Sequence, residues 1–150
     1  MKNIKTITVL CSLILFAISL TQTAIVIKDF DGNHIEPSYQ YFLIGPIAIL
    51  GGGLFEWLIW LANPAYFISI FLLLKNRRRP AILLSALSIC ISLSFLFWHQ
   101  ILASEDGRTA EIISFGLGYY LWIAAMLCFF IGIISSTLFS RVIDKPLDIN

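Results

Sequence analysis

Four long apolar segments constrain the fold of this 150-residue chain more than any other feature. They cover approximately residues 7–27, 54–74, 80–102 and 113–138. An α-helix rises 1.5 Å per residue, so about 20 apolar residues cross the roughly 30 Å of hydrocarbon in a bilayer. Because unpaired peptide groups are too costly in hydrocarbon, such segments cross it as helices. The sequence therefore predicts an all-α fold, an integral membrane four-helix bundle that forms a single membrane domain over residues 1–150.

The composition excludes an ordinary soluble domain. The chain is 59% hydrophobic, against roughly 45–50% apolar residues in soluble domains. Its three cysteines, Cys11, Cys90 and Cys128, each lie inside an apolar segment, and there is no C-x-x-C pair for redox chemistry or metal binding. We expect them to pack as small apolar side chains.

The distribution of basic residues predicts the orientation. Eight of the ten Lys and Arg residues fall before the first span, between the second and third, or after the fourth. Such an excess marks cytoplasmic segments. We therefore expect a multi-pass protein of the bacterial inner (plasma) membrane with both termini in the cytoplasm. The eight residues are Lys2, Lys5, Lys75, Arg77, Arg78, Arg79, Arg141 and Lys145.

The first apolar segment has two interpretations. Two lysines ahead of an apolar stretch are typical of a secretory signal peptide as well as of a first span. The apolar stretch continues to Ile27, and residues 22–24 make a poor cleavage site. We favour a retained helix. Cleavage would leave three spans in the same orientation.

A short separate element is expected before the second helix. Gly45-Pro46 and the triple glycine at residues 51–53 interrupt the apolar run. Glycine costs backbone entropy in a helix, and proline lacks the donor N–H. We predict an interfacial or re-entrant element at residues 41–50, with the second helix at residues 54–74.

Glu56, Asn63 and Pro64 form the first candidate site. An ionisable group inside a span is a functional-site hypothesis by default, because burying its charge is costly. Asn63 lies two helical turns after Glu56 on nearly the same face, and Pro64 frees the carbonyl of Trp60. This stripe could bind a cation, a proton or a polar ligand group. Alternatively, Glu56 extends to the interface and Asn63 hydrogen-bonds a neighbouring helix.

His99 and Tyr120 extend this candidate ligand or ion stripe. His99 lies at about the depth of Glu56 near the end of the third span, and Tyr120 lies at the corresponding end of the fourth. A contact between Glu56 and His99 would make a proton-responsive pair. Alternatively, His99 hydrogen-bonds a loop, and the aromatic residues near it anchor the helices at the membrane interface.

Two stripes of small residues predict close helix packing. Small side chains let helix backbones approach each other where lipid supplies no hydrophobic drive. The two stripes could pack on each other within one chain, which is the simpler reading, or between chains. They consist of Gly116, Ala124, Cys128, Gly132 and Ser136 on the fourth span, and Ser85, Ser88 and Ser92 on the third.

The basic turn of Lys75, Arg77, Arg78 and Arg79 has a topological role. It could also bind anionic headgroups of the inner leaflet, at about 1 kcal/mol per basic residue. Nucleic-acid binding is not expected, because the turn is short and a span begins on each side of it.

The chain lacks recognised catalytic motifs, and we predict no catalytic residues, cofactor or metal site. We expect a non-enzymatic protein that acts through contacts with another membrane or periplasmic protein, as an accessory subunit or an immunity-type protein. Its other expected partners are membrane lipids and, in a homo-oligomer, further copies of itself. The alternative is a small oligomeric transporter or channel subunit that uses the Glu56, Asn63 and Pro64 stripe. A membrane enzyme is a third hypothesis.

Overall fold

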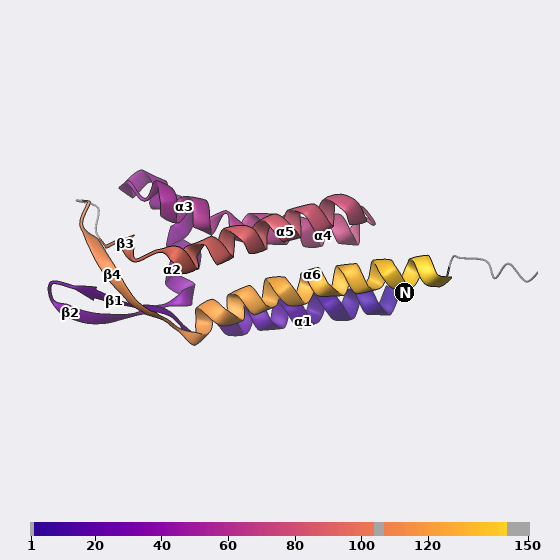
Figure 1. Cartoon of the computed structure of the whole chain (residues 1–150), viewed down its shortest axis with the longest axis horizontal. Coiled ribbons are helices and arrows are strands. Elements are labelled where there is room, and N and C mark those ends of the chain that lie inside the picture. Colours follow the sequence, from indigo (N-terminus) through magenta and orange to yellow (C-terminus); the bar gives the residue numbers. More distant parts are fainter. Residues whose placement is uncertain (1, 104–106, 144–150) are drawn as a thin grey trace, which may run out of the picture.

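The computed structural model describes residues 2–103 and 107–143, with side chains described for residues 4–103 and 107–137. Helices fill most of this part of the chain, and short strands lie between them (Figure 1). The elements are α1 (Lys2–Leu20), β1 (Thr23–Asp29), β2 (Gly32–Pro37), α2 (Ser38–Ile44), the 3-10 helix η1 (Gly45–Gly51), α3 (Leu54–Trp60), α4 (Ala62–Leu74), α5 (Arg78–Ser94), the 3-10 helix η2 (Phe95–Phe97), β3 (Gln100–Leu102), β4 (Thr109–Phe115) and α6 (Leu117–Ile143).

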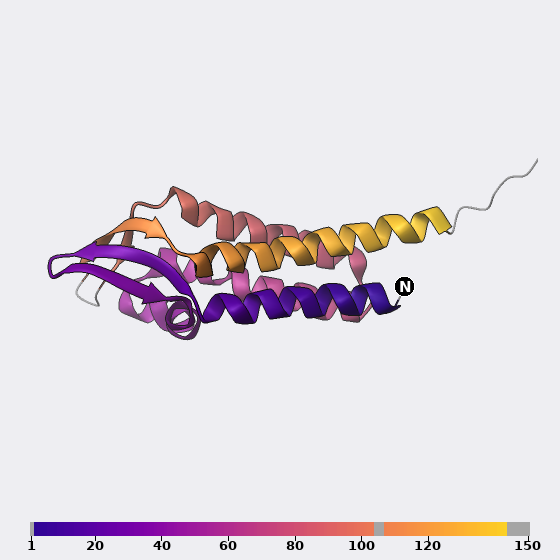
Figure 2. The ribbon, with the colours of Figure 1, turned by 90° about the horizontal axis from the view of Figure 1, so that it is seen from below.

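The long helices form two antiparallel pairs. Helix α1 lies alongside α6, and α4 lies alongside α5, with α5 also contacting α6 (Figures 1 and 2). Three apolar helical stretches, Leu54–Leu74, Arg78–Phe97 and Leu117–Thr137, are long enough to cross a membrane. The apolar part of α1, Ile4–Leu20, is shorter. The second predicted span therefore keeps its boundaries, with a break at Leu61 between α3 and α4.

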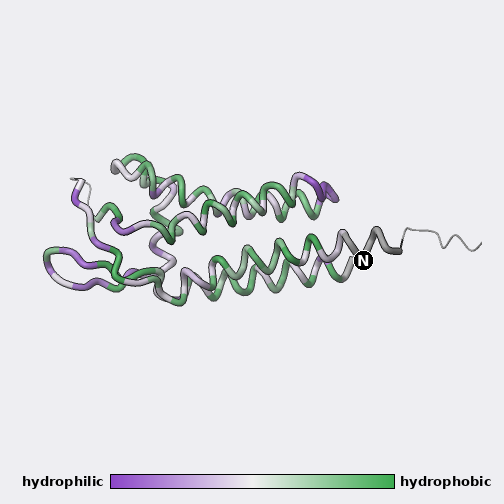
Figure 3. The backbone as a smooth tube through the Cα atoms, viewed as in Figure 1, coloured by the Kyte–Doolittle hydropathy of each residue, from purple (hydrophilic) through white to green (hydrophobic). Residues whose placement is uncertain are grey.

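Hydrophobic residues predominate along these helices (Figure 3), and many of them lie on the outer surface. Ile7 on α1, Leu83 on α5 and Ile131 on α6 are each more than half exposed. Exposure of so much apolar surface to water is unfavourable, whereas its contact with hydrocarbon is not. The surface therefore suits helices that face lipid.

Two of the basic segments, the start of α1 and the α4–α5 turn, meet at one end of the molecule. The Lys5 ammonium donates a hydrogen bond of 2.6 Å to Asn76 Oδ1, so the start of α1 lies beside the α4–α5 turn. This turn carries the hydrophilic residues seen at one end in Figure 3, and the strands lie at the opposite end. We call these the basic end and the sheet end.

A four-stranded antiparallel sheet forms the sheet end, in the order β2-β1-β4-β3. Its central pair joins two segments far apart in the sequence, with Ile25 opposite Phe115 and Lys28 opposite Glu111. The sheet corrects the prediction of an all-α fold. The four-helix membrane bundle is thus seen only in part, as a mostly helical molecule with three candidate spans and a small sheet.

The first predicted span, residues 7–27, was wrong at its end. Helix α1 stops at Leu20, and residues 23–29 form β1. This segment is rich in β-branched side chains, which favour a strand. Its hydropathy alone does not distinguish it from the end of a membrane-spanning helix. The β-branched residues are Thr23, Ile25, Val26 and Ile27. In the strand, Ile25 and Ile27 alternate toward the buried side.

The third and fourth predicted spans also contain strand residues, because apolar residues of β3 and β4 extend the hydrophobic run. In the third span, α5 ends at Ser94 and η2 at Phe97, and β3 follows. In the fourth, β4 continues to Phe115 before α6 begins. The element predicted at residues 41–50 corresponds to α2 and η1. Gly52 ends η1 with a φ of 87°, a left-handed conformation that favours glycine.

Two clusters of buried apolar side chains hold the molecule together. One lies between the helices and includes Phe16, Tyr66 and Phe129, which are at most 5% exposed. The other lies between the sheet and the adjoining helix ends and includes Ile25, Ile101 and Tyr119. The sheet is therefore packed on the helices rather than joined to them only by loops.

Candidate functional site

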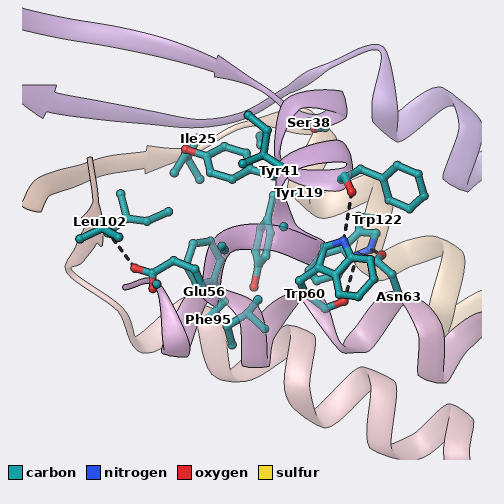
Figure 4. A pocket seen from close by; sticks show the side chains of 18 of the residues that line it. Ile25, Ser38, Tyr41, Glu56, Trp60, Asn63, Phe95, Leu102, Tyr119 and Trp122 are labelled. Carbon is teal, nitrogen blue, oxygen red and sulfur yellow. Dashed lines mark hydrogen bonds between the residues drawn. The ribbon is translucent and has the colours of Figure 1, made fainter. Parts of the chain in front are cut away.

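A pocket of about 750 Å³ lies at the sheet end, between the sheet, the α2–η1 segment, α3 and the adjoining parts of α1 and α6 (Figure 4). Its volume is within the range of about 300–1,000 Å³ that is usual for small-molecule sites. Most of the lining is apolar, with Phe16 and Leu20 from α1, Ile25 and Ile101 from the sheet, and Ile59 from α3. The few polar groups on its wall therefore decide what it can bind.

Glu56 is the one charged side chain among the described residues that line the pocket. It is half-buried in the first turn of α3. Its Oε1 accepts a hydrogen bond of 2.9 Å from the backbone N–H of Leu102, so the carboxylate ties α3 to β3 (Figure 4). The hydrogen bonds found among the described residues leave Oε2 without a partner.

Tyr41 of α2 also lines the pocket, above Glu56 in the view of Figure 4. Burial raises the pKa of the Tyr41 hydroxyl, and the negative charges of Glu36 and Glu56 raise it further. The hydroxyl is therefore neutral at physiological pH and available as a hydrogen-bond donor. Within the described part of the chain, it has no hydrogen-bond partner.

Asn63 lies at the other side of the pocket, and both ends of its amide are occupied. Its Nδ2 donates a hydrogen bond of 3.1 Å to the carbonyl of Trp60, and its Oδ1 accepts one of 2.8 Å from the indole Nε1 of Trp122. The carbonyl that Pro64 frees is thus satisfied by the preceding side chain. Of Glu56, Asn63 and Pro64, Glu56 alone has a side-chain oxygen without a hydrogen-bond partner among the described residues.

Trp60 fixes the α2–η1 segment against α3. Its indole Nε1 donates a hydrogen bond of 3.0 Å to the carbonyl of Phe42. Its ring lies so close to Gly45 that a Cβ atom at position 45 would overlap it. Glycine permits this close approach, and the approach holds one wall of the pocket in place.

The remaining residues of the predicted stripe lie outside the pocket lining. His99 is exposed just before β3, and its carbonyl accepts a hydrogen bond of 2.9 Å from the N–H of Ile112. The hydrogen bonds and ion pairs of the described residues do not join it to Glu56. Tyr120 is 54% exposed, whereas its neighbour Tyr119 is buried and donates a hydrogen bond to the Ser92 carbonyl.

The small residues predicted for helix packing lie at helix contacts. A Cβ atom at Gly132 would overlap the side chain of Thr8, and one at Gly116 would overlap the backbone of Thr23. Gly132 of α6 therefore meets α1, and Gly116, just before α6, meets the start of β1. Ser136 is 8% exposed, and Ala124 and Cys128 are half-buried on α6. On α5 the fully buried serines are Ser85, Ser88 and Ser92.

The basic turn lies at the far end from the pocket. Lys75, Arg77 and Arg79 are exposed, and Arg78 is half-buried. Their positions keep these charges away from any ligand in the pocket.

Sequence reasoning missed Tyr41, Trp60 and Trp122 as part of the site. Trp60 and Trp122 resemble the aromatic residues found at any membrane interface, and their partners come from distant segments. The triple glycine at residues 51–53 was the available signal, because the chain reverses there between η1 and α3, with Gly52 in a left-handed conformation.

Comparisons with protein-family models, with curated proteins and with solved structures give no match for this chain. Its function is therefore argued from the pocket.

Proposed function

We propose that this chain is a non-enzymatic, multi-pass membrane protein that binds a hydrophobic or amphipathic molecule in the pocket at its sheet end. The observation that carries the proposal is the pocket itself, a cavity of about 750 Å³ with a mostly apolar lining and a few polar groups. This combination is typical of sites that bind small molecules, in which apolar contacts supply affinity and sparse polar groups orient the ligand.

The proposal places four helices in the bacterial inner membrane. Helix α1 would be the fourth, because it lies along α6 and carries exposed apolar residues such as Leu10 and Ile14. The basic end would face the cytoplasm, in line with the excess of lysine and arginine there. The pocket would then lie at the outer surface of the bilayer, beneath the sheet.

The polar groups in the pocket suit binding better than catalysis. The hydroxyl of Tyr119 is already bonded to the Ser92 carbonyl, and the amide of Asn63 is bonded at both ends. Nucleophilic catalysis needs a nucleophile within hydrogen-bond reach of a base. The described pocket lining offers no such pair.

Photolabelling tests this function. The purified protein is reconstituted in phosphatidylcholine vesicles with a neutral single-chain amphiphile that carries a diazirine on its chain, and labelled peptides are mapped by mass spectrometry. Labelling of pocket residues should exceed that of lipid-facing residues such as Ile131. Ala48→Trp should abolish the excess, because Ala48 lines the pocket, whereas Ile49→Trp next to it should not. Equal labelling of pocket and lipid-facing residues in the unaltered protein would refute the proposal.

A second candidate function is supported by the edge of the sheet. Strand β2 pairs with β1 on one side only, so its other side can accept an extended segment from a partner protein. Ile35 on this strand is 71% exposed, and Phe30 in the adjoining turn is 87% exposed. This surface is where an accessory or immunity-type protein would meet a membrane or periplasmic partner.

Site-specific crosslinking tests this second candidate. A photo-crosslinking amino acid at Ile35 should give a discrete product in cells, and the same amino acid at Ile14 on α1 should give none of that size. A product of twice the mass of the chain would identify a second copy as the partner. Identical products from both positions would exclude the edge as the binding surface.

A further inference from the structure

We propose that the molecule bound in this pocket is a bilayer amphiphile whose polar group is a cationic or neutral hydrogen-bond donor, held by Glu56 and Tyr41. The inference rests on the proposed function and adds the chemical class and direction of the ligand. Its apolar chain would extend toward Trp60 and Trp122. An amphiphile with an anionic headgroup would be rejected.

The charge of the pocket excludes an anionic headgroup. Glu56 is the one charged group among its described lining residues, and the lining includes neither lysine nor arginine. An anion placed there would lose its hydration and meet a carboxylate with no compensating cation. An ammonium or hydroxyl group would instead donate to that carboxylate in a charge-assisted hydrogen bond.

The hydrogen-bonding groups that remain available define the position of the polar group. Among the described side chains that line the pocket, the Ser38 hydroxyl also lacks a hydrogen-bond partner, but its oxygen is buried. The groups that a ligand can reach are therefore those of Glu56 and Tyr41. Leu102 occupies Oε1 of Glu56, which leaves Oε2 as an acceptor. Tyr41 lies close enough for the charge of Glu56 to act on its hydroxyl, and that hydroxyl is a donor. An alcohol can donate to the carboxylate or accept from the Tyr41 hydroxyl, and an ammonium can donate to the carboxylate. Both groups lie on the side of the pocket nearest β3 (Figure 4).

The opposite side of the pocket suits an apolar chain. Figure 4 shows Trp60, Asn63 and Trp122 grouped away from Glu56. The polar atoms of this group bond one another or the carbonyl of Phe42. What Trp60 and Trp122 offer a ligand is therefore ring surface. The pocket is polar at one end and apolar at the other, which fixes the direction of an amphiphile.

The rim of the pocket indicates that the ligand comes from the bilayer. Ile44, Ile47 and Leu50 of the α2–η1 segment line the pocket and are also 49%, 58% and 85% exposed. Apolar side chains on a rim are unfavourable in water and favourable against hydrocarbon. A mouth framed by them opens toward lipid, so a membrane-dissolved molecule reaches it without crossing water.

Two photoreactive amphiphiles with the same diazirine chain test the inference, one with a primary amine head and one with a carboxylate head. Each is added to the protein in phosphatidylcholine vesicles, which carry no net charge. Pocket labelling is divided by labelling at lipid-facing Ile131, so that a difference in partitioning cancels. We expect this ratio to be about tenfold higher for the amine, as a charge-assisted hydrogen bond implies.

Three variants test whether Glu56 and Tyr41 are responsible for the difference in labelling. Glu56→Gln keeps an acceptor for Leu102 and should bring the ratios for the two probes together. Tyr41→Phe should lower labelling by a third amphiphile, which has the same diazirine chain and an alcohol head. Glu111→Gln is the matched control, because Glu111 is an exposed carboxylate on β4 outside the pocket lining, and it should change nothing.

The outcomes separate this inference from the proposed function. Strong pocket labelling by both probes to the same extent, or a preference for the carboxylate, would overturn the ligand class and leave the pocket as a binding site. A preference for the amine that persists in Glu56→Gln would overturn the role of Glu56. Pocket labelling no higher than that at Ile131 for every probe would overturn both proposals.

Discussion

The indole Nε1 of Trp122 donates a 2.8 Å hydrogen bond to Oδ1 of Asn63, and this bond joins α6 to the start of α4. Asn63 is only 5% exposed and uses its Nδ2 on the carbonyl of Trp60. One side chain thus satisfies the carbonyl that Pro64 leaves free and also links the two helix pairs. Few groups at this depth can replace either bond.

We therefore expect Trp122→Phe to destabilise the fold by about 1–3 kcal/mol, because it leaves a buried amide oxygen without its donor. Equilibrium unfolding in mixed micelles, followed by circular dichroism, measures the change. Trp57→Phe is the control, since no hydrogen bond of the Trp57 indole is found within the described residues. Equal losses for the two variants would show that ring packing, not the bond, sets the cost.

A second prediction concerns the buried serine of α1. Ser12 donates a hydrogen bond of 2.7 Å to the carbonyl of Ala125, so the Tyr66 hydroxyl is the donor in its bond to Ser12. Ser12→Ala leaves that donor without an acceptor in a fully buried position, so it should lower the free energy of unfolding by about 1–3 kcal/mol. Tyr66→Phe removes the donor and should cost only about 0.5–1.5 kcal/mol. The same unfolding measurement ranks the two, and the reverse order would contradict this assignment of the hydrogens.

The contact between Gly132 and Thr8 gives a third prediction. Gly132→Ala places a Cβ atom where the Thr8 side chain lies, so overpacking should destabilise the α1–α6 pair by about 1–3 kcal/mol. Thr8→Ala in the same chain removes Cγ2 and Oγ1, the two nearest atoms, but leaves the Cβ atom of residue 8 at 2.9 Å, so it should restore part of the loss. Additive effects in the double variant would show that the two positions do not meet. Ile131→Ala, on the exposed face of α6, should have a smaller effect.

The long helices follow from the sequence because hydrocarbon demands a long apolar run. The second span and the basic turn after it were found in this way. The sheet was missed because Thr23 to Ile27 and Ile112 to Phe115 are apolar enough to extend a span. What makes them strands is pairing between β1 and β4, which begin 86 residues apart in the chain. Local hydropathy does not contain that information.

The candidate site was predictable to the extent that one residue was chemically out of place. Glu56 stands out because a charge in an apolar run is costly. The part played by Tyr41 depends on α2 folding back over α3, which Gly45 and Trp60 bring about by a close approach. Asn63 lines the same pocket as Glu56, but its partner Trp122 comes from another helix. Spacing along one helix predicts neighbours on that helix and not those on a second one.

The orientation of the chain gives the last prediction. In a cysteine-free background, made by replacing Cys11, Cys90 and Cys128, single cysteines are introduced as Asp31→Cys and Arg77→Cys. Both positions are exposed, one in the β1–β2 turn and one in the basic turn, so labelling reports the side of the membrane and not burial. A membrane-impermeant maleimide should label position 31 in intact cells and position 77 only after the membrane is permeabilised, because arginine-rich turns stay in the cytoplasm. Labelling of position 77 in intact cells would reverse the orientation and place the pocket on the cytoplasmic side.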